Sequence, residues 1–132
     1  MNFKPHHTAL TVKNTDESIR WYQDKLGFAV THRYNKHGME ITILELDGVR
    51  LELFCYGEDT KPLPKYRNDL MADLHVIGTK HISIQVDNIH QIVKELKGKG
   101  VEFVMEIDTA GFGGMYTFFK DCNGILVEIF QP

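Results

Sequence analysis

The sequence predicts an α+β fold built from two tandem βαβββ modules. Residues 5–56 and 80–132 follow the same plan, in which a short strand precedes a helix and three further strand-like runs. Residues 57–79 have no counterpart in the second copy and are expected to form a connecting arm. With 132 residues, 42% of them hydrophobic, the whole chain 1–132 suits a single domain with its own core.

Four landmarks recur in the two copies at matching spacings. They are a histidine at the first strand, a glycine at the end of the helix, and a glycine followed by a glutamate in the last strand. In order they are His7, Gly27, Gly48 and Glu52, then His81, Gly100, Gly124 and Glu128. The histidine precedes the helix-ending glycine by 20 and 19 residues, and the last glycine precedes the glutamate by 4 in both copies. Chance similarity of two αβ segments does not account for four ordered matches.

The elements of the first module can be assigned in order. HTALTV (7–12) alternates as a strand, and Asn14 with Glu17 forms a capping box for a helix that Gly27 ends. Three strands follow, with turns at 36–38 and 47–48; they are FAVTHRY (28–34), ITILEL (41–46) and VRLELFCY (49–56).

The second module repeats this order. HISIQV (81–86) is the first strand, Asp87 or Asn88 can cap the helix, and Gly98 with Gly100 closes it. The three strands are VEFVMEI (101–107), MYTFFK (115–120) and ILVEIF (125–130), the last two joined by a DCNG turn. A short helix is expected within the arm at Tyr66–Leu74.

Charge and cysteine content narrow the class of protein. A net charge of −3 and a pI near 6.1 predict neither a nucleic-acid partner nor a membrane partner. The N-terminal segment has no apolar signal core, which favours a cytoplasmic location. Cys55 and Cys122 are expected to be free thiols, with a disulfide left open until their geometry is known.

Side-chain alternation distinguishes the two adjacent histidines. Thr8, Leu10 and Val12 form the apolar face of the first strand, so His7 points to the opposite face, and His6 points with the apolar set or lies at a frayed end. The same alternation in HISIQV places His81 opposite the apolar face. His7 and His81 are therefore equivalent positions of the repeat.

The last strand of each module supplies a carboxylate. Glu52 and Glu128 each interrupt a strongly apolar strand, and such a carboxylate is costly unless something neutralises it. Each could simply face solvent or pair with an arginine such as Arg50. Two His–Glu pairs at equivalent positions instead favour a metal site, because two imidazoles and two carboxylates suit a divalent first-row cation. Two modules related by a pseudo-twofold axis would bring both pairs together.

These segments resemble the vicinal oxygen chelate superfamily, which contains glyoxalase I, methylmalonyl-CoA epimerase, extradiol dioxygenases and bleomycin-binding proteins. The resemblance is carried by HHTALTVKNTDESIRWYQDKLGF, VRLELF, GTKHISIQVDNI and DCNGILVEIFQ. It implies a single domain whose paired modules form a cupped mixed sheet around a metal. It also implies the ligand set His7, Glu52, His81 and Glu128, a small-molecule substrate and a homodimer.

The ligand set favours the glyoxalase I-like branch, because extradiol dioxygenases generally lack a ligand at the position of Glu52. The resemblance therefore implies a lyase or isomerase that holds Ni, Co or Zn, with Fe or Mn as further candidates. Glutathione-using bacterial members typically carry an arginine and an asparagine where this chain has Thr11 and Tyr56, which argues against glutathione. An extradiol-type dioxygenase and a non-catalytic drug- or metabolite-binding protein are the alternatives.

The expected mechanism is proton transfer on a substrate chelated through two adjacent oxygens. The cation would stabilise an enediolate, and Glu128 or Glu52 would act as the catalytic base. Ser83, Gln85, Met115 and Tyr116 are candidate lining residues. The glycine-rich loop before Met115 is expected to be a flexible turn rather than a phosphate loop, because it leads into a strand.

Overall fold

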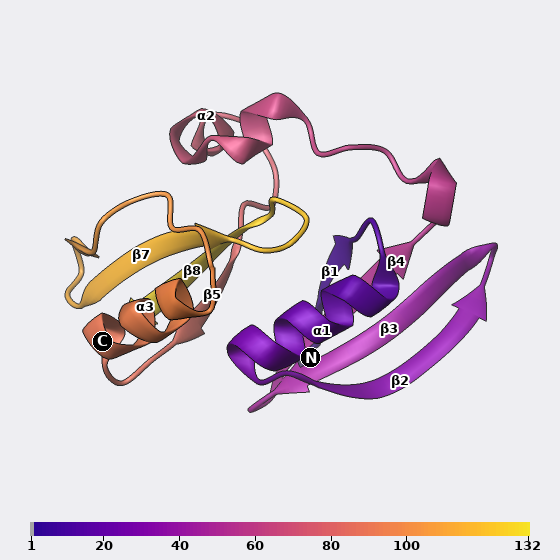
Figure 1. Ribbon diagram of the computed structural model, residues 1–132, viewed down its shortest axis with the longest axis horizontal. Coiled ribbons are helices and arrows are strands. Elements are labelled where there is room, and N and C mark those ends of the chain that lie inside the picture. Colours follow the sequence, from indigo (N-terminus) through magenta and orange to yellow (C-terminus); the bar gives the residue numbers. More distant parts are fainter. Residues whose placement is uncertain (1) are drawn as a thin grey trace. The chain divides into compact units, whose positions relative to one another are not determined.

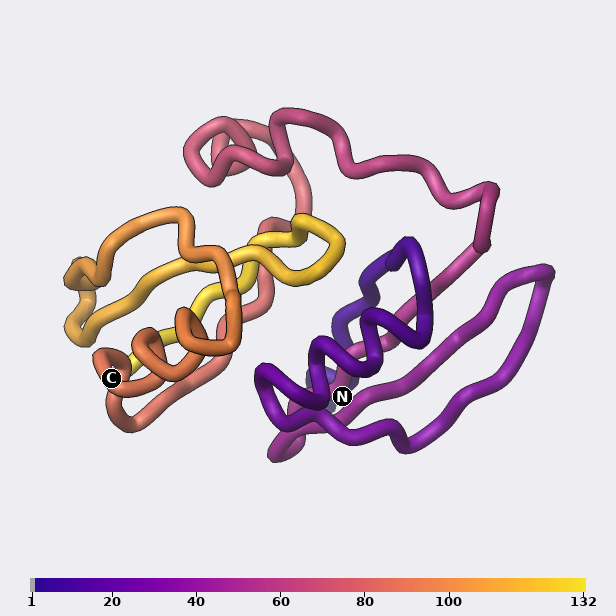
Figure 2. Tube along the Cα trace, viewed as in Figure 1, coloured from indigo at the N-terminus to yellow at the C-terminus, as the bar shows by residue number. Residues whose placement is uncertain are grey.

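The computed structural model describes residues 2–132, which divide into two compact units. Unit 1 runs to Pro62 and unit 2 from Leu63 to Pro132, so each unit is one uninterrupted stretch of chain (Figure 2). Each unit contains a four-stranded mixed sheet with a helix on one face (Figure 1). The predicted α+β class and the two βαβββ modules are confirmed.

The sheet of unit 1 has the strand order β1-β4-β3-β2, with β1 parallel to β4 and the other pairs antiparallel. Its elements are β1 (Thr8–Thr11), α1 (Thr15–Leu26), β2 (Ala29–Lys36), β3 (Met39–Leu46) and β4 (Val49–Cys55). The helix begins where predicted, because the Asn14 side chain accepts from the Glu17 amide at 2.9 Å. It ends at Gly27, whose φ of 84° suits glycine.

The hydrophobic core of unit 1 lies between α1 and one face of its sheet. Leu51 and Leu53 of β4 and Leu44 of β3 are buried, as is Tyr22 of the helix. The intervening residues of β4 are only half-buried, which is the alternation expected for a sheet covered by a helix on one face. We call the opposite face of each sheet the helix-free face.

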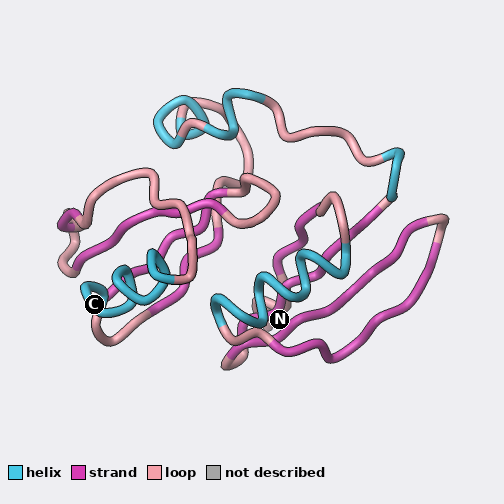
Figure 3. Tube along the Cα trace, viewed as in Figure 1, coloured by secondary structure: helices cyan, strands magenta, loops and turns pink. Residues whose placement is uncertain are grey.

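The sheet of unit 2 repeats this topology in the order β5-β8-β7-β6, with β5 parallel to β8. Its elements are β5 (Ile82–Gln85), α3 (Ile89–Gly98), β6 (Asp108–Thr109), β7 (Met115–Lys120) and β8 (Leu126–Gln131). Asn88 rather than Asp87 caps the helix, since its side chain accepts from the Gln91 amide at 3.1 Å. From β5 onward, the order of helix and strands in unit 2 therefore matches the order that begins with β1 in unit 1 (Figure 3).

The predicted strand at residues 101–107 is wrong. This segment makes an isolated bridge between Phe103 and Phe119, and the regular pairing is confined to β6. Two backbone bonds flank the bridge, from the Val104 amide to the Phe118 carbonyl and from the Lys120 amide to the Glu102 carbonyl, and the Thr117 hydroxyl donates to the Met105 carbonyl at 3.0 Å. Strand alternation alone predicted a longer strand, because it carries no information about how far a segment pairs with its neighbour.

The arm contains η1 (Gly57–Asp59), η2 (Lys65–Asn68) and α2 (Leu70–Leu74). The single helix expected at Tyr66–Leu74 is thus two pieces, because Asp69 caps α2 by accepting from the Ala72 amide at 2.9 Å. Within unit 2 the arm approaches the DCNG turn closely. A Cβ on Gly124 would lie 3.0 Å from the Asn68 side-chain oxygen.

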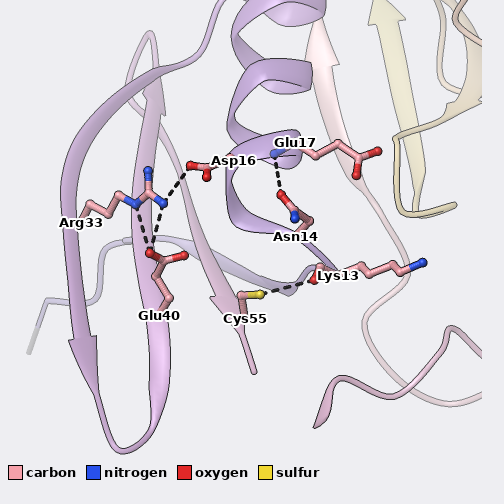
Figure 4. A network of polar contacts seen from close by, with 7 residues as sticks. All are labelled: Lys13, Asn14, Asp16, Glu17, Arg33, Glu40 and Cys55. Atoms are coloured by element: carbon pink, nitrogen blue, oxygen red, sulfur yellow. Dashed lines mark hydrogen bonds and ion pairs between the residues drawn. The ribbon is translucent and has the colours of Figure 1, made fainter. Parts of the chain in front are cut away.

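An ion-pair network joins α1 to the edge of the unit 1 sheet (Figure 4). Arg33 of β2 lies 2.9 Å from Asp16 and 3.1 Å from Glu40. These hydrogen bonds, first that of Asp16 and then that of Glu40, raise the pKa of Arg33 above its ordinary value. The network holds the N-terminal turn of the helix against β2 and β3.

Cys55 and Cys122 form no disulfide, as expected, and the Cys55 thiol donates to the Lys13 carbonyl at 3.5 Å (Figure 4). None of the helices within residues 2–132 has the length and apolar character needed to span a membrane.

Candidate metal centre

The first candidate pair lies on unit 1, where parallel pairing of β1 with β4 aligns Ala9 with Glu52. His7 immediately precedes β1, and its Nε2 atom lies 3.4 Å from Glu52 Oε1. Glu52 projects from the helix-free face, because its neighbours Leu51 and Leu53 are buried beneath α1. The register thus brings together one imidazole and one carboxylate separated by 45 residues in sequence.

The second candidate pair occupies the equivalent position on unit 2. Parallel pairing of β5 with β8 aligns Ser83 with Glu128, and His81 immediately precedes β5. The His81 Nε2 atom lies 3.9 Å from Glu128 Oε2. Val127 and Ile129 are buried on either side of Glu128, so this carboxylate also belongs to the helix-free face.

An arginine does not neutralise Glu52. Arg50 projects from the same face of β4, but its Nε atom pairs with Glu45 Oε1 on β3, which the antiparallel register places directly opposite. The simplest alternative to a metal ligand, an ion pair between Arg50 and Glu52, is therefore not observed. The side chain that lies beside Glu52 in this structure is that of His7.

His6 does not share the position of His7. Its ring meets the His7 ring edge to face, and the two Nδ1 atoms lie 2.8 Å apart. Because that contact uses His7 Nδ1, the His7 Nε2 atom is the nitrogen directed at Glu52. His6 thus contacts the proposed ligand from outside the pair, in the extended segment before β1.

The surroundings of the two pairs differ. In unit 2 the Ser83 hydroxyl donates to Glu128 Oε1 at 2.6 Å, and the His81 ring packs edge-on against Phe118 with centroids 4.6 Å apart. In unit 1 the residue aligned with Glu52 is Ala9, which has no hydroxyl. In the second pair, therefore, the carboxylate accepts a hydroxyl hydrogen bond and the imidazole contacts an aromatic ring.

Imidazole nitrogens and carboxylate oxygens are the donor atoms that divalent first-row cations bind, but neither pair alone offers enough of them. Such cations usually take at least three or four protein ligands, and each unit offers one imidazole and one carboxylate. Across residues 2–132, no group of three or more His, Cys, Asp or Glu side chains is placed so that it could hold a metal ion. Each pair supplies two of the four ligands predicted from the sequence.

Other predicted residues fall into different environments. Tyr116 packs edge-on against Phe118, 6.0 Å between centroids, on the helix-free face. Met115 alternates with the buried Thr117 and Phe119, which places it on the face of β7 opposite Tyr116. Elsewhere in unit 2, outside the predicted residues, Arg67 of η2 lies 3.5 Å from the buried Asp73 of α2.

The glycine-rich loop carries an aromatic contact that sequence reasoning missed. Phe112 stacks on Phe130, with centroids 5.3 Å apart and ring planes at 18°, yet Phe112 is 86% exposed. Phe130 lies two residues beyond Glu128 on the same face of β8. The only sequence signal was a phenylalanine between glycines, and a loop conformation that seats it on β8 cannot be read from alternation.

Comparisons with known proteins agree with this architecture. A family model described as Glyoxalase/Bleomycin resistance protein/Dioxygenase superfamily matches residues 4–129. The chain is 30% identical to the mitochondrial methylmalonyl-CoA epimerase of Homo sapiens, over 96% of this chain and 72% of that protein. It is 29% identical to glyoxylase I 4 of Arabidopsis thaliana, over 94% of this chain and 68% of that protein. The crystal structure of a glyoxalase family protein from Enterococcus faecalis matches with a TM-score of 0.79 and 25% identity, covering 96% of each chain.

Proposed function

Because the chain belongs to the Glyoxalase/Bleomycin resistance protein/Dioxygenase superfamily, we propose that it is a metal-dependent lyase or isomerase. The proposed reaction moves a proton on a small substrate that is chelated through two adjacent oxygens. One observation carries the proposal: a His–Glu pair recurs at the same register position in both βαβββ units, with separations of 3.4 Å and 3.9 Å. The similarity to an epimerase and a glyoxalase supports this reaction class.

The proposed ligands are His7, Glu52, His81 and Glu128, which together hold one divalent cation. Two carboxylates would cancel the charge of such a cation, and two imidazoles would complete a donor set that suits a first-row metal. Ni, Co or Zn is the proposed metal. The pairs that form one site belong either to one chain or to the two chains of a homodimer.

When bound, the cation supplies a positive charge that stabilises an enolate oxygen and makes the neighbouring C–H more acidic. The chain supplies the base: Glu128 or Glu52 takes the proton from that carbon, and the electron pair is delocalised onto the adjacent oxygen. In an epimerisation the first glutamate keeps the proton that it has taken, and the other glutamate of the proposed set, as the acid, delivers a proton to the opposite face of the same carbon. In a glyoxalase-type isomerisation the proton returns to the neighbouring carbon.

We propose a 2-carboxyacyl thioester, such as methylmalonyl-CoA, as the first substrate to test. Its thioester carbonyl and carboxylate offer the two adjacent oxygens, and a methylmalonyl-CoA epimerase is among the similar proteins. Thr11 and Tyr56 occupy the positions at which glutathione-using relatives typically carry an arginine and an asparagine. A glutathione hemithioacetal is therefore the comparison substrate rather than the expected one.

The test measures exchange of the substrate α-proton in D2O by NMR, with methylmalonyl-CoA as the probe. The parent protein loaded with Co²⁺ is expected to accelerate exchange, and Glu52→Gln and Glu128→Gln should each reduce turnover by at least about 100-fold. Glu102→Gln, an exposed carboxylate of unit 2, is the matched control and should retain parent activity.

Full activity in both glutamine variants would refute the proton-transfer mechanism. Oxygen uptake with a catechol in place of proton exchange would indicate a dioxygenase. Tight binding of a small molecule by a protein that holds no metal would indicate a binding protein.

A further inference from the structure

We propose that Ser83 is a positioning residue that fixes the Glu128 carboxylate for cation binding, and that it makes the two glutamates of the proposed site unequal. This inference rests on the proposed metal centre. It comes from a difference between two units that otherwise repeat each other closely. Parallel pairing aligns Ser83 with Glu128 and Ala9 with Glu52, so the two positions are equivalent in register but only one carries a hydroxyl.

The geometry of the contact favours a charge-assisted hydrogen bond. The Ser83 Oγ atom donates to Glu128 Oε1 at 2.6 Å, which lies in the range for a hydroxyl bound to a carboxylate. Glu128 Oε2 is the atom directed at His81 Nε2, 3.9 Å away. One carboxylate oxygen is therefore held by the protein and the other is presented beside the imidazole.

The strand backbone fixes the donor itself. Ser83 lies in β5 directly after the buried Ile82, and Glu128 lies in β8 between two buried residues. Neither side chain can exchange faces without shifting a strand by one residue. The Ser83 hydroxyl thus approaches Glu128 from a fixed position.

The neighbouring imidazole is also constrained in unit 2. The edge-on contact with Phe118 limits rotation of the His81 ring, and the residue aligned with Glu52 at the Phe118 position is the smaller Ile43. The His7 ring also has an edge-on neighbour, His6, so the clear difference between the two pairs is in their carboxylates, of which Glu128 accepts a hydroxyl hydrogen bond. Glu52, opposite Ala9, keeps more freedom to leave the cation and act on the substrate.

Partners of metal ligands commonly change metal affinity by 10-fold to 100-fold when they are removed. Ser83→Ala removes the hydroxyl at an exposed strand position, so the fold should tolerate it. Ser83→Thr keeps the hydroxyl and adds a methyl group that suits a strand. The pair of variants separates loss of the hydrogen bond from any change in shape.

The experiment titrates Co²⁺ into metal-free parent, Ser83→Ala and Ser83→Thr protein by calorimetry, and records the visible absorption of bound Co²⁺. We expect Ser83→Ala to weaken Co²⁺ binding at least about 10-fold and to alter the absorption band, since a loosened carboxylate changes the coordination geometry. Ser83→Thr should restore both within about threefold. Urea unfolding of the metal-free proteins serves as the control and should be unchanged in both variants.

Equal Co²⁺ affinity and equal spectra in the parent and Ser83→Ala would overturn the inference while leaving the metal centre intact. So would a Ser83→Thr protein that is folded but binds as weakly as Ser83→Ala. A parent protein that binds no Co²⁺ would refute the metal centre, and the positioning role would fall with it.

Discussion

Gly114 gives a quantitative test of the loop that precedes β7. The backbone there has a φ of 89°, and a Cβ would overlap the Gln131 carbonyl oxygen and lie 2.8 Å from the Cζ atom of Phe130. Gly113 has a φ of 103° and nothing within 4 Å of its Cβ position. Gly114→Ala therefore introduces backbone strain and a steric clash, whereas Gly113→Ala introduces strain alone.

The expected magnitudes follow from these two causes. A non-glycine residue at a left-handed φ costs about 1–2 kcal/mol, which is the prediction for Gly113→Ala. Overlap with a packed neighbour adds about 1–3 kcal/mol, so Gly114→Ala should cost roughly 2–5 kcal/mol. An unfolding entropy of about 2.1 cal/mol/K per residue over 132 residues gives roughly 4 °C per kcal/mol. The melting temperature should fall by about 4–8 °C for Gly113→Ala and by about 8–20 °C for Gly114→Ala.

Thermal unfolding followed by circular dichroism, with urea unfolding as a second measure, checks this prediction. Gly114→Ala should also disturb the aromatic stack on β8, because the new methyl group reaches the Phe130 ring. Equal destabilisation by the two alanine variants would refute the reasoning. It would mean that the close approach of Gly114 to the end of β8 is not present in solution.

Three further predictions follow from the site and its scaffold. Phe112→Ala should lower the free energy of unfolding in urea by about 0.5–1.5 kcal/mol, because it removes one aromatic stack, and unchanged stability would mean that the stack on Phe130 is not present in solution. Arg33→Met should cost about 0.5–1 kcal/mol in urea unfolding, because its ion pairs are partly exposed, and the loss should shrink in 1 M salt. The raised pKa of Arg33 keeps its charge at every pH below the ordinary arginine value, and the contribution is lost only as the pH rises through the raised pKa. Arg33→Met should thus lower the free energy of unfolding by the same amount at about pH 7 and pH 9. A loss of stability that disappears by pH 9 would mean that the charge of Arg33 is not its cause. Removal of a bound cation with EDTA should lower stability by about 2.7 kcal/mol when the free cation stands at 100 times its dissociation constant, and an unchanged melting temperature would argue against a bound metal.

Much of the fold could be predicted because the internal repeat tests each assignment twice. Asn14 and Gly27 mark the helix ends by chemistry that depends only on local sequence. The conformation of residues 101–107 could not be predicted, since it involves contacts with β7. One of them is the hydrogen bond that the Thr117 hydroxyl donates to the Met105 carbonyl, across 12 residues of sequence. Local alternation contains no information about such a tertiary bond.

The candidate pairs could be predicted because their positions depend on strand alternation and on which strands pair. Alternation places His7 and Glu52 on one face, and parallel pairing of first and last strands then brings them to 3.4 Å. The contact of Ser83 with Glu128 needed the exact register of β5 against β8, which alternation leaves open by two residues. The stack of Phe112 on Phe130 depends on a loop conformation that only the glycines hint at.

The most direct test of the central claim is the metal content of the purified protein and its dependence on the paired histidines. We predict one divalent cation per proposed site in the parent protein, measured by inductively coupled plasma mass spectrometry after dialysis. His7→Ala and His81→Ala should each abolish retention of the cation, while His90→Ala, an exposed histidine of α3, should retain it. A parent protein free of metal after growth with added Ni, Co and Zn, or a cation retained equally by His7→Ala and His90→Ala, would contradict the account.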